Sequence, residues 1–203
     1  MRAVFRRRWL WAVGALVALA AGGGAAAGVL ATRGSSAGTW FTPGRPPLEV
    51  SVRGGCPGSV AGYADVVTTY PGPSLVPANP TRGLICRYGP GVGIGLSASS
   101  RALLVSSTRL DAGRAQQLAG AIRQIRLTPS VGVFACPNDD GSVAVIGLAY
   151  GGRADVGLWY RTSGCQTLDN GRIGAFEGGN RSFYVGFEGV IDRLSPPIAP
   201  ADP

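Results

Sequence analysis

The chemistry open to this sequence is limited first by the residues that it lacks. The chain contains no histidine and no lysine, and all 19 of its basic residues are arginine. Without an imidazole group there is no Ser-His-Asp triad, no Cys-His pair and no histidine ligand for a metal ion. The remaining candidates for chemistry are a pair of aspartates, arginines beside an aromatic residue, and four cysteines.

Asp139 and Asp140 stand next to each other within residues 138–142, whose sequence is Asn-Asp-Asp-Gly-Ser. Adjacent carboxylates can act as an acid and a base, but Asn, Asp and Gly are also the residues that tolerate turn geometry. A calcium loop needs more oxygen ligands at defined spacing than this segment offers. We therefore expect a turn before a strand here, and no metal or other cofactor.

A second candidate combines arginine with an aromatic ring. Arg153, Trp159 and Arg161 recur at alternate positions of a predicted strand, together with Asp155 and Gly157, so alternation places all of them on one face. The opposite face is predicted to be core and consists of Ala154, Val156, Leu158 and Tyr160. The first face would bind an anionic ligand or a glycan if Trp159 stacks on it while the guanidinium groups hold its oxygens. The alternative is an ordinary sheet face, with Trp159 packed under a helix and Arg153 balanced by Asp155.

The four cysteines predict two disulfides. Cys56 and Cys86 are 30 positions apart, and Cys136 and Cys165 are 29 positions apart. Four cysteines allow three pairings, and the similar spacing favours pairing in chain order. Each bridge would then stabilise the fold by on the order of 3 kcal/mol. No two cysteines are near enough for a zinc knuckle, and disulfides indicate an oxidising compartment.

The amino terminus agrees with that compartment. Residues 1–8 carry four arginines, and residues 9–31 form an uncharged run that ends before Arg33. A bilayer is spanned by about 20 residues, and basic residues stay on its cytoplasmic side. We therefore expect a single-pass signal anchor in the cell membrane, with the rest of the chain outside. A signal peptide cleaved after residues 25–27, which yields a secreted protein, is the alternative.

The arginines of the amino-terminal segment account for most of the net charge of +8. Five of the 19 arginines lie at or before Arg33, whereas all 11 acidic residues follow it. The exported part therefore has 14 arginines and 11 acidic residues, a net charge of +3. Together with the compartment, this small excess argues against a nucleic acid as partner. The expected partners are the membrane itself, through residues 9–31, and an envelope protein or glycan.

A linker and a tail flank the exported domain. Residues 32–49 are rich in Gly, Ser, Thr and Pro, and residues 195–203 contain four prolines. These compositions predict a flexible linker and a disordered tail. Residues 50–194 remain as one folded domain.

Turn and helix signals predict the elements of this domain. Gly151-Gly152 and Asn170-Gly171 are typical two-residue hairpin turns and join four strands into an antiparallel meander. Further strands are predicted over residues 83–88, 93–98 and 102–107. Asp111 is a good N-cap for a helix that runs to Arg126. The apolar face of that helix consists of Ala115, Leu118, Ile122 and Ile125.

A second helix is predicted over residues 182–194, although two glycines weaken it. Strands in runs with two helices indicate an α+β fold. The expected architecture is an antiparallel sheet packed against one or two helices, with two disulfides, preceded by one transmembrane helix.

The short motifs that accompany these elements are Leu75-Val76-Pro77, Cys86-Arg87-Tyr88, Ala135-Cys136-Pro137, Asp139-Asp140-Gly141, Gly164-Cys165 and Asn170-Gly171. Together they resemble an exported actinobacterial domain of unknown function, over roughly Cys56 to Leu194. The resemblance implies a secreted or membrane-tethered domain with paired cysteines, and it brings no catalytic residues. The stretch from Cys136 to Phe176 is also faintly similar to the subtilisin-inhibitor family of secreted bacterial proteins, from which the upstream cysteines depart.

These observations favour a non-enzymatic binding or interaction module at the cell envelope. A secreted protease inhibitor is the first alternative, and a hydrolase that uses two carboxylates is the second. An exposed proline loop beside a cysteine favours inhibition, and two carboxylates about 5 to 10 Å apart in a pocket favour hydrolysis. A shallow surface of arginine and tryptophan favours binding.

Overall fold

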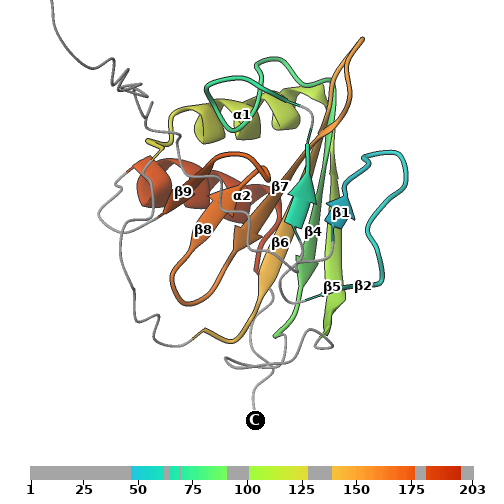
Figure 1. Ribbon diagram of the computed structural model, residues 1–203, viewed down its shortest axis with the longest axis vertical. Coiled ribbons are helices and arrows are strands. Elements are labelled where there is room, and N and C mark those ends of the chain that lie inside the picture. The colour runs from blue at the N-terminus through green and yellow to red at the C-terminus, as the bar shows by residue number, and fades with distance from the viewer. Residues whose placement is uncertain are drawn as a thin grey trace, which may run out of the picture. The chain divides into compact units, whose positions relative to one another are not determined.

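The computed structural model describes residues 47–61, 65–68, 70–90, 101–127, 139–176 and 182–197 (Figure 1). In chain order, its elements are β1 (Pro47–Glu49), β2 (Ser59–Ala61), β3 (Asp65–Val67), β4 (Arg82–Tyr88), β5 (Arg101–Leu110), α1 (Ala112–Arg123), β6 (Val143–Ala149), β7 (Val156–Arg161), β8 (Thr167–Asp169), β9 (Gly174–Phe176), the π-helix η1 (Ser182–Glu188) and α2 (Gly189–Leu194).

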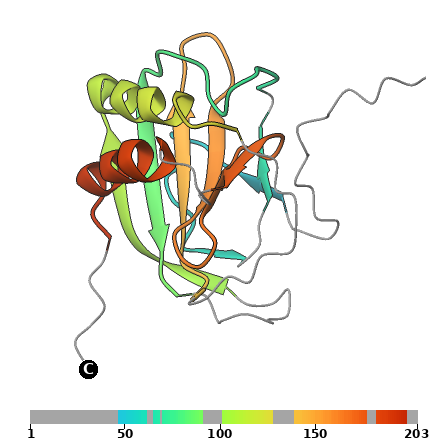
Figure 2. The ribbon, with the colours of Figure 1, turned by 90° about the vertical axis from the view of Figure 1, so that its left-hand side faces the viewer.

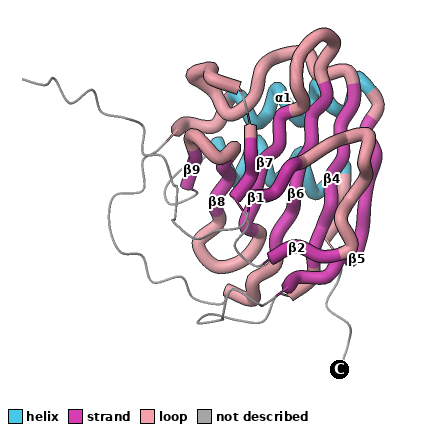
Figure 3. The backbone as a smooth tube through the Cα atoms, turned by 45° about the vertical axis from the view of Figure 1, so that its right-hand side comes forward, coloured by secondary structure: helices cyan, strands magenta, loops and turns pink. Residues whose placement is uncertain are grey.

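The predicted antiparallel sheet is present. Among the described residues it has seven strands in the order β2-β5-β4-β6-β7-β8-β9, and it curves into a half-barrel (Figure 3). The helices lie on one face of this sheet, and β1 and β3, which form a separate parallel pair, lie on the other (Figure 2). The described part therefore has a sheet covered on both faces, by helices on one side and by amino-terminal strands on the other, whereas the sequence predicted packing against one or two helices and no such pair of strands.

Strands β6 to β9 form the predicted meander, because each pairs antiparallel with the next. The connection between β6 and β7 is longer than the expected two residues, since β6 ends at Ala149 and β7 begins at Val156. Between β8 and β9, the Oδ1 atom of Asn170 accepts hydrogen bonds of 3.0 Å from the backbone N–H groups two and three positions further on. This side chain, with Gly171 at a φ of 81°, widens the expected two-residue turn to residues 170–173.

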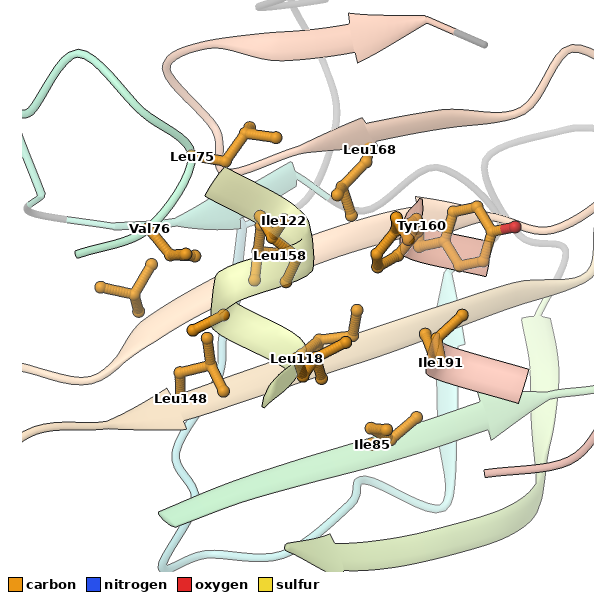
Figure 4. Packing of buried hydrophobic residues seen from close by; sticks show 14 of the residues in the cluster. Leu75, Val76, Ile85, Leu118, Ile122, Leu148, Leu158, Tyr160, Leu168 and Ile191 are labelled. Atoms are coloured by element: carbon orange, nitrogen blue, oxygen red, sulfur yellow. The ribbon is translucent and has the colours of Figure 1, made fainter. Parts of the chain in front are cut away.

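The first predicted helix is confirmed as α1. Asp111 caps it, because its Oδ1 accepts a hydrogen bond of 2.9 Å from the backbone N–H of Arg114. The helix ends at Arg123, slightly before the expected end, and its predicted apolar face is buried. Figure 4 shows Leu118 and Ile122 of this face packed over the side chains of β4, β6 and β7.

The second predicted helix is present as η1 followed directly by α2. Phe183 and Phe187 are fully buried against Tyr160 of β7. The three ring centroids lie 5.0 to 6.0 Å apart, and two of the three ring pairs meet edge to face. Each such pair adds about 0.5–1.5 kcal/mol beyond the burial of its area. This aromatic cluster holds the C-terminal helical segment on the sheet.

Two facing glycines let the amino-terminal strands pack closely on the other face. Gly147 of β6 and Gly157 of β7 are cross-strand partners. A Cβ atom on Gly157 would lie 2.6 Å from Cγ1 of Val66, and one on Gly147 would lie 2.8 Å from Cγ1 of Val50. β1, which begins at Pro47, lies inside the segment that was predicted to be linker.

One predicted disulfide is confirmed, since Cys56 and Cys86 are bonded with their Cα atoms 5.6 Å apart. The predicted pair of Cys136 and Cys165 includes a residue outside the described part and stays a prediction. The predicted strand over residues 93–98 also lies outside it.

The predicted cytoplasmic segment, the predicted anchor of residues 9–31 and most of the predicted linker lie outside the described residues as well. Among the helices that the structure does describe, none has the length and apolar character needed to cross a membrane.

Candidate functional site

Trp159 does not lie on an open face. Asp155, Gly157 and Trp159 do share one face, as alternation predicts, but the segment that carries β1 to β3 covers it. Trp159 is 1% exposed, and Asp155 accepts a hydrogen bond of 3.0 Å from the backbone N–H of Val52 instead of balancing Arg153. This corrects the expected stacking surface, because an indole buried to this degree has no free ring face for a ligand.

Arg161 lies at the end of β7 and forms an ion pair with Asp139. The side chain of Asp139 is only 6% exposed, and it also accepts hydrogen bonds from the hydroxyl of Ser163 at 3.1 Å and the backbone N–H of Gly141 at 3.0 Å. Arg161 therefore ties the end of β7 to the segment that precedes β6. The structure does not bring it together with Arg153.

Asp140 belongs to the turn that the sequence predicted. Its Oδ1 accepts a hydrogen bond of 2.8 Å from the backbone N–H of Ser142, and its own N–H donates to the hydroxyl of Ser163 at 3.2 Å. Burial raises the pKa of Asp140, but hydrogen bonds from Ser163 and Ser142 outweigh it and leave that pKa below its ordinary value. The carboxylate serves the turn as an ionised acceptor.

Arg153 lies beside a tyrosine. Its guanidinium carbon is 5.8 Å from the ring centroid of Tyr150, which is a cation–π contact. The Tyr150 hydroxyl donates to the carbonyl of Pro77 at 3.1 Å and so fixes the ring. Arg123, in the last turn of α1, and Tyr70, upstream of β4, lie near enough to act electrostatically on the same phenol. We call Tyr70, Arg123, Tyr150 and Arg153 the arginine–tyrosine surface.

The charge of the arginine–tyrosine surface is positive. Burial raises the pKa of Tyr150 and Tyr70 raises it further, whereas Arg153 and Arg123 lower it. The net shift is upward, so Tyr150 is neutral at physiological pH and the two guanidinium groups carry the charge. Both arginines are exposed, and within the described residues neither forms an ion pair.

The sequence pointed to only one member of this surface, Arg153. Tyr150 directly follows β6, whereas Tyr70 and Arg123 belong to segments far from it along the chain. No spacing rule connects such positions, because only the packing of α1 over the sheet brings Arg123 to the end of β6. A local signal existed for Tyr150 alone, as an aromatic residue next to a predicted turn.

A second polar cluster lies beneath the C-terminal helical segment. Arg87 of β4, which is 6% exposed, donates to the carbonyl of Ser195 at 2.7 Å and to Oδ1 of Asp192 at 2.8 Å. The Tyr160 hydroxyl donates to Oε1 of Glu188 at 2.9 Å, and burial, reinforced by Glu188, raises the pKa of Tyr160. Both carboxylates therefore have partners inside the fold and bind the helix to the sheet.

Within the described ranges, no three His, Cys, Asp or Glu side chains form a group suited to a metal ion. The arginine–tyrosine surface is thus the best-defined candidate site in this part of the chain. Comparisons with protein-family models, with curated proteins and with solved structures find no match.

Proposed function

We propose that this protein is a non-enzymatic binding module on the outer side of the cell membrane, tethered by residues 9–31, and that its arginine–tyrosine surface takes an anionic glycan. One observation carries the proposal. Arg153 lies 5.8 Å from the ring centroid of Tyr150, Arg123 acts on the same phenol, and among the described residues no carboxylate is one of the charges that act on it.

The chemistry of these side chains fits such a ligand. A guanidinium group presents a planar fork of N–H donors that pairs with the two oxygens of a carboxylate. Tyr70 is half-buried, packs partly against the core and has its hydroxyl 3.2 Å from that of Ser74, so it is held in place beside the two arginines. Because Tyr150 is held by Pro77 and covered by Arg153, the surface is ordered before a ligand arrives, which lowers the entropy cost of binding.

The two alternatives have less support in the described residues. Asp139, Asp155 and Asp192 accept hydrogen bonds from backbone or arginine donors, which occupies them for structural purposes rather than for proton transfer. Pro57, beside a disulfide cysteine, is exposed as an inhibitory loop demands. Its carbonyl, however, accepts a hydrogen bond of 3.0 Å from the hydroxyl of Tyr88 and is held against the sheet.

Binding of the purified full chain in detergent to polygalacturonate, a polymer of uronic acid, tests the proposal. We expect binding to this polymer and none to neutral dextran, with an affinity that falls as salt is added. Arg153→Gln should raise Kd by about tenfold or more, because a hydrogen-bonded contact to a charged group is worth roughly 1.5–3 kcal/mol.

Arg172→Gln is the matched control, since it removes one exposed arginine from the connection between β8 and β9 and gives the same net charge. Equal losses for Arg153→Gln and Arg172→Gln, or no binding to the anionic polymer, would refute the proposed surface. The tether is tested separately by mass spectrometry of the mature amino terminus, where a chain that starts near Gly28 would exclude a retained anchor.

A further inference from the structure

The outer edge of β5 is longer than the strand that pairs with it. β5 has ten residues, and its inner edge pairs with β4 along most of its length. On the outer edge, β2 pairs only with Arg101 to Leu103, and one more hydrogen bond of 2.9 Å joins Leu104 N–H to the carbonyl of Gly58. Within the part of the chain that the structure describes, no strand pairs with the outer edge over residues 105–110 (Figure 3).

The side chains at this edge are unusual for a strand that faces water. Leu103 and Val105 are 65% and 47% exposed, and they are two of only three large apolar side chains that are exposed among the described residues. Residues 105–110 contain no proline and only one charged residue, Arg109. Soluble proteins usually protect a free edge with lysine, with proline or with a covering segment, because an open edge pairs readily with another strand.

We infer that this edge accepts an extended segment of an acidic partner protein, which adds to the sheet as a strand next to β5. Backbone hydrogen bonds along residues 105–110 would supply the affinity, and Val105, within the open stretch, would contact an apolar side chain of the added segment. Six paired residues span about 20 Å at the rise of an antiparallel strand. This interaction uses none of the residues of the arginine–tyrosine surface and does not depend on the function proposed for it.

The charges beside the edge indicate the partner's chemistry. Arg109 lies within the open stretch, and Arg101 lies at the other end of β5, where β2 pairs with it. Both are exposed and neither forms an ion pair within the described residues, although Arg109 donates a hydrogen bond of 3.4 Å to the carbonyl of Val52. A second copy of this chain would bring the same two cations to the same edge, and the exported part already carries +3. Like charges across paired strands destabilise the pairing, whereas carboxylates there stabilise it. The charge pattern therefore favours an acidic segment over a second copy.

Hydrogen–deuterium exchange of the full chain in detergent, with and without a synthetic ten-residue peptide, tests this inference. The peptide alternates valine with glutamate, and its counterpart carries N-methyl groups on alternate residues, which removes donors without changing charge. We expect the acidic peptide to slow amide exchange within residues 105–110 by about tenfold or more. The N-methylated peptide, and a peptide with lysine in place of glutamate, should leave exchange there unchanged.

Val105→Lys should abolish this protection, and Val185→Lys is its matched control because Val185 is a 71% exposed valine on η1. Circular dichroism establishes that each variant is folded, and the N-methylated peptide tests the same edge without any substitution. Equal protection by the acidic and the lysine peptide, no protection by either, or protection that rises with protein concentration alone would overturn the inference. The last of these results would identify a second copy as the occupant.

Discussion

Substitution of Gly157 by alanine tests the most specific packing feature of this fold, the close approach of the amino-terminal strands to the sheet. The added Cβ would lie 2.6 Å from Cγ1 of Val66 and 2.8 Å from Cγ2 of Val50. Optimal contacts between carbon atoms are about 3.5–4.0 Å long, so one side must move by about 1 Å. Neither side moves freely, because Val66 is 2% exposed and Gly157 pairs within the sheet.

Overpacking of this kind usually costs about 1–3 kcal/mol. For a chain of this length, a loss of 1 kcal/mol lowers Tm by about 2–4 °C, so Gly157→Ala should lower Tm by roughly 2–12 °C. Thermal unfolding followed by circular dichroism measures this change. Gly120→Ala is the control, since the added Cβ would meet nothing within 4 Å beyond its chain neighbours and the backbone of its own helix, and alanine favours a helix by about 0.5–1 kcal/mol.

A double-mutant cycle identifies the cause of the loss. Val66→Ala removes the nearer of the two valine methyl groups that the new Cβ would meet, so the double variant with Gly157→Ala should lose less stability than the sum of the two single variants. If Gly157→Ala unfolds at the wild-type temperature, or if the two effects add within about 0.5 kcal/mol, the strands do not pack on the glycine pair as described.

Three further predictions concern polar side chains. Asp192→Ala should lower the free energy of unfolding by roughly 1–2 kcal/mol in urea titrations, because buried Arg87 loses its charged partner. The loss is limited because the side chain of Asp192 is about half exposed to water. An unchanged free energy of unfolding would mean that the ion pair does not hold α2. Asn170→Ala should lower the free energy of unfolding by about 2–4 kcal/mol in the same assay, because Asn170 is fully buried and makes three hydrogen bonds through its side chain. One of them, of 2.8 Å, goes to the carbonyl of Leu75, and the other two lie within the turn. Asn170→Asp should keep only the two hydrogen bonds within the turn. Burial raises the pKa of Tyr88 to about 12 from 10.0, so its contribution to stability is intact below pH 10 and is lost as the pH rises toward 12. Between pH 9 and 12, the free energy of unfolding should therefore fall less in Tyr88→Phe than in the wild type. An equal fall in both proteins would contradict this prediction.

Local signals in the sequence predicted much of the fold. Asp111 as N-cap and the apolar spacing after it predicted α1, because the cap and the buried face act within a few residues. The spacing of Cys56 and Cys86 predicted their disulfide. The turn residues predicted the hairpins of the meander, but they did not predict the length of the connections, since the side chain of Asn170 bonds beyond a two-residue turn.

The candidate site was less predictable. Alternation placed Asp155, Gly157 and Trp159 on one face correctly, but no local pattern indicates what covers that face. The sequence therefore grouped Trp159 with Arg153, whereas the structure buries the indole and places Arg153 beside Tyr150. The reason is physical, because alternation separates two faces of a strand without specifying which one meets solvent.

The sequence by itself determined the positive amino-terminal segment, the positions of the helices and the strands of the meander, and the absence of imidazole chemistry. These follow from composition and from interactions between residues close along the chain. Only the tertiary structure decided which arginines remain exposed, which carboxylates are engaged, and which strand edge is left open. Each of these depends on segments that meet from distant parts of the chain, such as Val66 against Gly157 and Arg123 near Tyr150.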